Sequence, residues 1–311
     1  MYLKLVLITC VLAFFAVVFS AFARLSDAGL GCANWPACYQ ENALKQRQPP
    51  GPDVTRDHSS WRWRLQNLAG ALLGILAISI CGYSWQKRRE LRQSPLLSVL
   101  LVVLMAFLAV FGIVAFSYLP RAVIVLVHLA GGIAALTLLT WILLRQMAPE
   151  QVNNSGVRAL RAFARLGLAM LMAEIMLGGW VSSNFAALAC NGFPLCQGSL
   201  LPAMDFSYSL KIDGLPLSDA RLTAIHWLHR AGAILVTCYL CWLSIRLLTI
   251  HELHKIGRSI LGLILLQFAL GVFNILLGFP LAGAVLHNAV AMLLLMVLVH
   301  LNFRIQNQKR T

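Results

Sequence analysis

Three histidines lie within long apolar stretches of this chain, where an ionisable side chain is costly unless a partner compensates it. His128, His229 and His287 each come about seven to nine residues after the start of an apolar run, roughly 10–13 Å along a helix with a rise of 1.5 Å per residue. A single such histidine is as readily a hydrogen-bonded core residue as a ligand. Three at one depth favour ligation of iron by neutral imidazole, as in haem proteins. His229 and His287 then form one axial pair, whereas His128 has no partner histidine on the second predicted helix of its half.

Two closely spaced cysteine pairs form a second motif, Cys32 with Cys38 and Cys190 with Cys196. Five residues that include a proline separate the two thiols of each pair, which favours a small disulfide-closed loop in an oxidising compartment. A zinc site is one alternative, although zinc sites usually have more ligands and shorter spacing. A redox-active dithiol that exchanges with an external thiol carrier is another.

These motifs recur at a nearly constant interval, which indicates an internal repeat. The cysteine pairs recur after 158 residues and two of the histidines after 159. The chain therefore divides into two copies of one half. We predict an N-terminal four-helix bundle at 1–146, a cytoplasmic linker at 147–161 and a C-terminal four-helix bundle at 162–311.

The composition places the motifs in a membrane. Hydrophobic residues make up 59% of the chain and charged residues 12%, and the mean hydropathy is +0.77, which excludes an ordinary soluble domain. The net charge of +14 does not indicate nucleic-acid binding, because the basic residues gather in short connectors. The sequence has no phosphate-binding loop, dinucleotide fingerprint, Ser-His-Asp order or metalloprotease helix, so hydrolases and nucleotide-driven pumps have little support.

The predicted fold class is an all-α integral membrane protein with eight transmembrane helices in two repeated four-helix bundles. Each apolar run approaches the ~20 residues that cross a hydrocarbon core. The first run is interpreted as a span and not as a signal peptide, because it continues to Ala23 without a clear small-residue cleavage site. The predicted spans are 3–23, 64–86, 95–118, 121–144, 162–184, 221–247, 258–279 and 281–303.

Basic connectors predict the orientation, because short loops rich in Lys and Arg stay in the cytoplasm. Four such segments occur, at 86–92, 145–165, 251–258 and 304–310. We therefore expect a multi-pass protein of a bacterial-type inner membrane with both termini in the cytoplasm. The long segments 24–63 and 185–220, which carry the cysteine pairs, are expected on the outer side.

Several stretches together resemble the heme A synthase family. They are RLSDAGLGCANWPAC, VHLAGG at His128, IHWLHR at 225–230 and GVFNILLGFPLAGAVLHNAVAMLL around His287. The resemblance covers nearly the whole chain. It implies an oxidoreductase that converts haem O to haem A for cytochrome c oxidase by oxidising a ring methyl group to a formyl group. It further implies that His229 and His287 hold a haem b cofactor and that His128 belongs to the substrate-haem site.

The second predicted span departs from the pattern of this family. The family carries a Glu there, followed three residues later by a His-Arg pair, and the sequence WRWRLQNLAGALLG has neither. One alignment register puts Leu65 and Arg62 at the His and Glu positions, and the other puts Gln66 and Trp63 there. His58, nearer the membrane surface, is a candidate substitute ligand. The catalytic residue is therefore unknown, and the loss of a carboxylate threatens the proton chemistry more than the fold.

Other charged or polar residues near the predicted sites have interpretations that the sequence leaves open. Arg24 and Arg230 either pair with haem propionates or extend to the membrane interface. Glu174, inside the fifth span, is either protonated, hydrogen-bonded at a helix contact or part of a proton path. His226 lies about one turn before His229 and is expected beside the site and not on the iron.

Three functional hypotheses follow. The leading one is the membrane enzyme, with haem O as substrate, lipid around it and an unidentified electron-transfer partner. The second is a catalytically degenerate relative that binds haem b and acts as an oxidase assembly or haem-handling factor. The third is an electron carrier or transporter built from parallel repeats. Haem O synthase and oxidase assembly factors are further candidate partners, and no nucleic-acid partner is expected.

Overall fold

The structure is a computed structural model that describes residues 1–27, 61–91, 94–115, 119, 121–152, 155–206 and 218–306. Within these residues it is built of α-helices, and the only β-type pairing is an isolated bridge between Cys196 and Ser199. The helices are α1 (Tyr2–Asp27), α3 (Trp61–Gln86), α4 (Leu96–Ala115), α5 (Arg121–Met147), α6 (Ser155–Ser183), α7 (Asp219–Leu248), α8 (His254–Leu276) and α9 (Leu281–Arg304).

Most of these helices are long and apolar enough to cross a bilayer. Seven of them meet this description, with 20 to 30 residues each. The helix outside this set is α6, which carries Arg158, Arg161 and Arg165 in its first half and Glu174 in its second. The all-helical fold and the membrane setting are thus confirmed, and the transmembrane placement of α6 stays a prediction.

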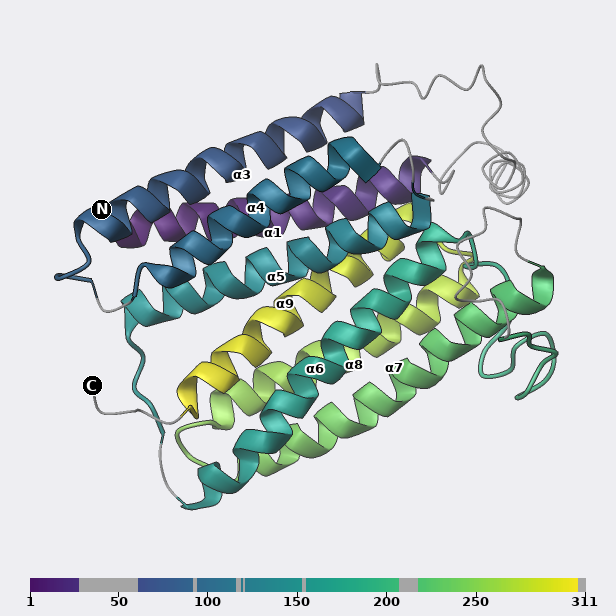
Figure 1. The fold of residues 1–311 in the computed structure, drawn as a ribbon. Coiled ribbons are helices and arrows are strands. Elements are labelled where there is room, and N and C mark those ends of the chain that lie inside the picture. Colours follow the sequence, from purple (N-terminus) through teal and green to yellow (C-terminus); the bar gives the residue numbers. More distant parts are fainter. Residues whose placement is uncertain are drawn as a thin grey trace.

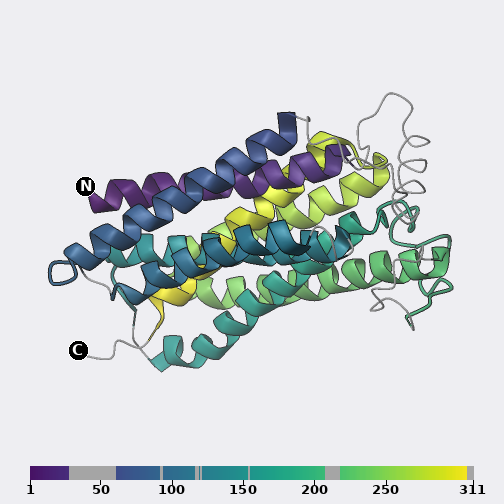
Figure 2. The ribbon, with the colours of Figure 1, turned by 45° about the horizontal axis from the view of Figure 1, so that its top comes forward.

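Contacts between helices fall into two closed sets (Figures 1 and 2). In the first set α1 packs on α3 and α5, and α4 also packs on α3 and α5. In the second set α6 packs on α7 and α9, and α8 also packs on α7 and α9. The two sets meet where α5 contacts α6 and α9, and where α1 contacts α9. Each of the three histidines that were predicted as ligands therefore lies on a helix within a closed ring of four helices.

All described connectors with basic residues lie at one end of the molecule, together with the start of α1 and the end of α9 (Figure 1). This end holds the turn after α3, where Lys87 pairs with the exposed Glu90 at 2.8 Å. The opposite end holds the loop between α6 and α7 and the tight turn between α8 and α9. At that turn Gly278 and Phe279 take positive φ angles of 69° and 60°, and Pro280 caps α9.

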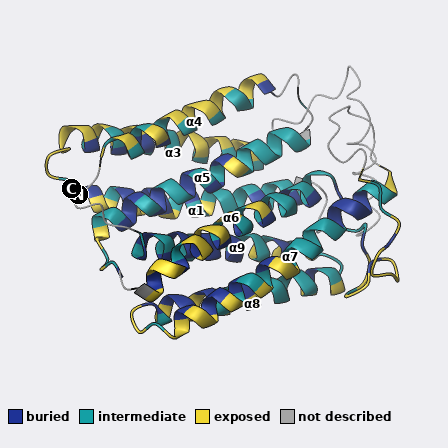
Figure 3. Cartoon of the chain, turned by 60° about the horizontal axis from the view of Figure 1, so that its bottom comes forward, coloured by how far each residue is buried: buried dark blue, intermediate teal, exposed yellow. Residues whose placement is uncertain are grey.

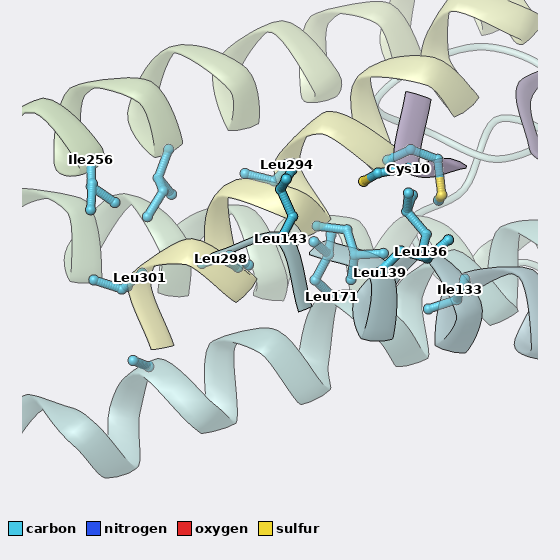
Figure 4. Close-up of a cluster of buried hydrophobic side chains, with 14 of the residues drawn as sticks. Cys10, Ile133, Leu136, Leu139, Leu143, Leu171, Ile256, Leu294, Leu298 and Leu301 are labelled. Carbon is cyan, nitrogen blue, oxygen red and sulfur yellow. The ribbon is translucent and has the colours of Figure 1, made fainter. Parts of the chain in front are cut away.

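Large apolar side chains cover the outer faces of the helices, and the buried residues face inward (Figure 3). Ile78 is 62% exposed and Ile113 78% exposed, as expected where lipid tails replace water. Figure 4 shows the central cluster, where Leu136 and Leu139 of α5 pack near Cys10 of α1. Cys10 is thus a buried apolar packing residue, although its Sγ also lies 3.8 Å from the Thr140 hydroxyl.

The predicted spans agree with the helices to within four residues at each end, apart from the start of α6. That helix begins at Ser155 and not near residue 162, so it extends into the segment that was predicted to be a linker. Arg161 explains the extension, because its Nε donates a hydrogen bond to the Ile305 carbonyl at the end of α9 and so fixes the first turns of α6. His58 and the Cys32–Cys38 pair lie outside the described residues, and those predictions are not tested.

Candidate haem site

His229 and His287 come together within the second set of helices. His229 lies on α7 and His287 on α9, about 15 Å and 9 Å from the first residues of these helices at the helical rise of ~1.5 Å per residue. Both α7 and α9 also pack against α6 and α8, so the two histidines lie within the same ring of four helices. Both rings are partly buried, and the Nδ1 atoms are fully buried without an aligned hydrogen bond.

Each of these imidazoles faces a glycine on a neighbouring helix. A Cβ atom at Gly178 of α6 would lie 3.2 Å from His229 Cε1, and one at Gly271 of α8 would lie 3.3 Å from His287 Cε1. The missing side chains let each imidazole lie close against the neighbouring helix. The residues present fit a haem in the chemistry of their donors, since two imidazoles are a common axial ligand pair for haem iron. In the described residues no three His, Cys, Asp or Glu side chains gather as a metal cluster, but haem iron takes only two axial protein ligands.

A glutamine lies at the nitrogen of His287 that usually binds iron. Gln267 Nε2 is 3.1 Å from His287 Nε2, and the Gln267 Oε1 atom is buried without a partner. An amide that donates to Nε2 leaves the ring proton on Nδ1, which is the tautomer in which Nε2 offers its lone pair. The Gln267 side chain would have to move away from His287 Nε2 for iron to bind this nitrogen.

His128 occupies the corresponding place in the first set of helices. Its Nδ1 atom is 2.9 Å from the Ile124 carbonyl, one turn earlier on α5, and its ring packs against Phe111. A Cβ atom at Gly112 of α4 would lie 3.2 Å from His128 Nε2. The Gly112 and His128 pair thus repeats the Gly271 and His287 pair, with the same separation of 16 residues.

The helix α3 supplies no ligand opposite His128. It contains no histidine and no carboxylate, and its buried residues begin only at Ala77. Of the two candidate histidine positions, Leu65 is 43% exposed on the outer surface. Gln66 is partly buried, and its Oε1 atom is fully buried without a partner. The structure therefore favours the register in which Gln66 stands where the family has its histidine.

A disulfide-closed loop packs over the first half of α7. Cys190 and Cys196 are bonded, which confirms the predicted pairing of this motif, and both are almost completely buried. Gln197 Nε2 donates to the Ala189 carbonyl at 2.8 Å and to the Thr223 hydroxyl at 3.0 Å. The loop is thereby fixed to α7 at Thr223, six residues before His229.

Arg230 is the main contact between α7 and this loop. Its guanidinium donates to the carbonyls of Cys190, Gly192 and Leu195, and its Nε donates to His226 Nε2 at 3.3 Å. His226 is buried about one turn before His229, and its role beside the site stays a prediction. The structure thus gives Arg230 a loop-binding role, while its contact with a propionate stays a prediction. Arg24 lies in the last turn of α1, and its propionate contact is likewise untested.

Two features of the site were missed in the sequence. The first is the glycine 16 residues before His128 and before His287, which a comparison of the two copies at the repeat interval would have found. The second is the contact of Glu174 with His229, 2.6 Å between Oε1 and Nδ1. No local spacing links residues 55 positions apart on different helices, so this contact had no signal in the sequence.

Together the fold and the site define a polytopic helical membrane protein with paired imidazoles suited to haem iron. A family of cytochrome oxidase assembly proteins matches residues 3–299. The chain is 33% identical to a heme A synthase of Shewanella oneidensis over 95% of this chain and 94% of the relative. It is 26% identical to a heme A synthase of Halalkalibacterium halodurans over 90% and 89% of the two chains. The chain belongs to this family of cytochrome oxidase assembly proteins.

Proposed function

We propose that this member of the family is a heme A synthase, which oxidises a methyl group of haem O to the formyl group of haem A. The observation that carries the proposal is the pair His229 and His287, each beside a glycine on a neighbouring helix. The 33% identity to a heme A synthase over nearly the full length supports the same activity. The enzyme acts in a bacterial membrane, with haem O reaching it from the lipid phase.

The resident cofactor in this proposal is haem b, held by His229 and His287 through their Nε2 atoms. A bound haem supplies the one-electron chemistry that protein side chains lack. The protein residues fix the ligand orientation and exclude water: the disulfide loop covers the outer end of α7, and Arg230 secures the loop. His128 is proposed as the substrate-haem ligand of the N-terminal half, where its Nδ1 contact with the Ile124 carbonyl leaves Nε2 directed at Gly112.

The two closed sets of helices support the further proposal that the chain is a parallel repeat of two four-helix bundles. The gathering of basic residues at one end supports an orientation with both termini in the cytoplasm. With α6 across the membrane as well, both haem sites lie nearer the outer face, on the side of the disulfide loop.

A degenerate haem-binding relative is the second candidate, and α3 is the observation that favours it. The family Glu and His are absent from this helix, and a Cβ atom at Gly70 or Gly74 would meet nothing within 4 Å, so neither glycine faces a neighbouring helix. Such a protein keeps the haem b half and lacks turnover, because no carboxylate is available on α3 to accept protons.

Expression of the chain in cells that make haem O separates these candidates. Extracted haem A supports the synthase, whereas bound haem b with unchanged haem O supports the degenerate relative. His229→Ala and His287→Ala should each abolish the low-spin haem b spectrum, and His300→Ala, at the inner end of α9, should leave it intact. A low-spin spectrum that survives either of the first two substitutions would refute the ligand assignment.

A further inference from the structure

Glu174 places a carboxylate on the far side of one proposed haem ligand. It lies in the second half of α6 and is 9% exposed. Its Oε1 atom is 2.6 Å from His229 Nδ1 on α7, a contact at ion-pair distance that is not aligned as a hydrogen bond. Its other oxygen, Oε2, lies against α7 one turn further on, where a Cβ atom at Gly232 would be only 2.2 Å away.

We propose that Glu174 is a positioning residue that accepts the Nδ1 proton of His229 and so fixes this imidazole as a haem ligand. The inference rests on the proposed haem site at His229 and His287. A buried carboxylate is costly unless it is paired. Among the described residues the ion pair of Glu174 is with His229, and Gly232 provides the space in which the carboxylate sits.

The chemical consequence lies in the ligand strength of His229. A ligating histidine whose Nδ1–H is bound by a carboxylate has a fixed tautomer and a more basic Nε2 atom. A more basic, more negative ligand stabilises ferric over ferrous iron, so the carboxylate lowers the reduction potential. Glu174 therefore makes the haem of the C-terminal half a better electron donor than it would be if His229 Nδ1 faced a neutral partner.

The described helices of the other half hold no corresponding carboxylate. His128 Nδ1 faces the neutral carbonyl of Ile124. The first helix of that half, α1, has no acidic residue before Asp27 at its end. The two haem sites thus differ in the charge behind their ligands, which separates the potentials of the two haems.

The test is a redox titration of the purified full-length protein with haem b bound. Glu174→Gln keeps the shape and removes the charge, and it should raise the midpoint potential enough to increase the ferrous-to-ferric ratio about tenfold at the wild-type midpoint, about 59 mV for one electron. Glu150→Gln, on the exposed connector after α5, is the matched control and should leave the potential unchanged. Glu174→Asp, which keeps the charge, should retain most of the wild-type potential.

A second variant moves the carboxylate without changing it. In Gly232→Ala the new methyl group must displace the Glu174 carboxylate, so this variant should shift the potential in the same direction as Glu174→Gln. A wild-type midpoint potential in haem-loaded Glu174→Gln would overturn the inference. If Glu174→Gln does not fold, a wild-type midpoint potential in Gly232→Ala would overturn it instead. Wild-type protein that binds no haem would instead overturn the proposed function, so the two failures are distinguishable.

Discussion

Replacement of Arg230 by methionine tests whether this residue holds the disulfide loop on α7. The substitution keeps an unbranched, apolar side chain of similar reach and removes every guanidinium hydrogen bond. The wild-type side chain donates to three loop carbonyls and to His226. Two of those bonds, to Gly192 and Leu195, are exposed to solvent and contribute little.

The partly buried bond to the Cys190 carbonyl carries most of the effect. A hydrogen bond from a charged donor contributes about 1.5–3 kcal/mol, and its loss leaves a buried carbonyl unsatisfied. We take about 2 kcal/mol for the change in the free energy of loop opening. At 1.4 kcal/mol per factor of ten, the open population rises about 30-fold.

The assay is the rate at which a reductant cleaves the Cys190–Cys196 disulfide in folded protein, read by mass spectrometry of alkylated peptides. Both cysteines are almost fully buried, so reduction requires local opening and its rate reports the open population. We expect an increase of about 30-fold in Arg230→Met. Arg221→Met, which removes a 3.1 Å ion pair with Asp205 outside the disulfide ring, should change the rate less than threefold. Equal reduction rates in Arg230→Met and Arg221→Met would refute the role of Arg230 in holding the loop on α7.

Two further substitutions test the two proposed haem sites. Gln66→His should restore a second imidazole opposite the α5 histidine and add a low-spin haem signal. Leu65→His, on the lipid-facing surface, should add no such signal. A signal in the Leu65 variant alone would show that Leu65, and not Gln66, stands at the histidine position of the family. Gly271→Leu should displace the α9 imidazole and lower the haem b content at least tenfold, because that Cβ position is already 3.3 Å from the ring. Gly262→Leu on the same helix has nothing within 4 Å and should keep full occupancy, and equal occupancy in both variants would contradict the site.

Apolar run length predicted the helices well, because each crossing needs about 20 apolar residues whatever it packs against. The error at α6 has a definite cause. Arg158 and Arg161 indicated a solvated connector, but an arginine in the first turns of a helix can stay helical and bind a neighbouring helix end, as Arg161 does at Ile305. Where a helix begins among polar residues, its first residue therefore depends on tertiary contacts, which a hydropathy profile does not record.

The candidate site was predictable where it followed from depth and repetition. His229 and His287 were found from their positions in apolar runs, and the disulfide from its spacing. Arg230 shows the limit: its position suggested a propionate contact or extension to the membrane interface, and its hydrogen bonds to the loop carbonyls were not anticipated. Glu174 was recognised as an expensive residue, but its partner depends on how α6 faces α7, which no single-sequence pattern encodes.

The two halves share one structural feature of their sites and differ in another. In both, a glycine on the third helix faces a histidine on the fourth, 16 residues later. Only the second half adds a histidine on its second helix and a carboxylate behind it. A haem held on both faces leaves slowly, because two iron–ligand bonds must break, and a resident cofactor benefits from that. The family that the chain resembles carries a histidine on its second span, and α3 has none. The divergence of α3 therefore weakens retention of haem in the first half, and a second imidazole at residue 66 should tighten haem binding there.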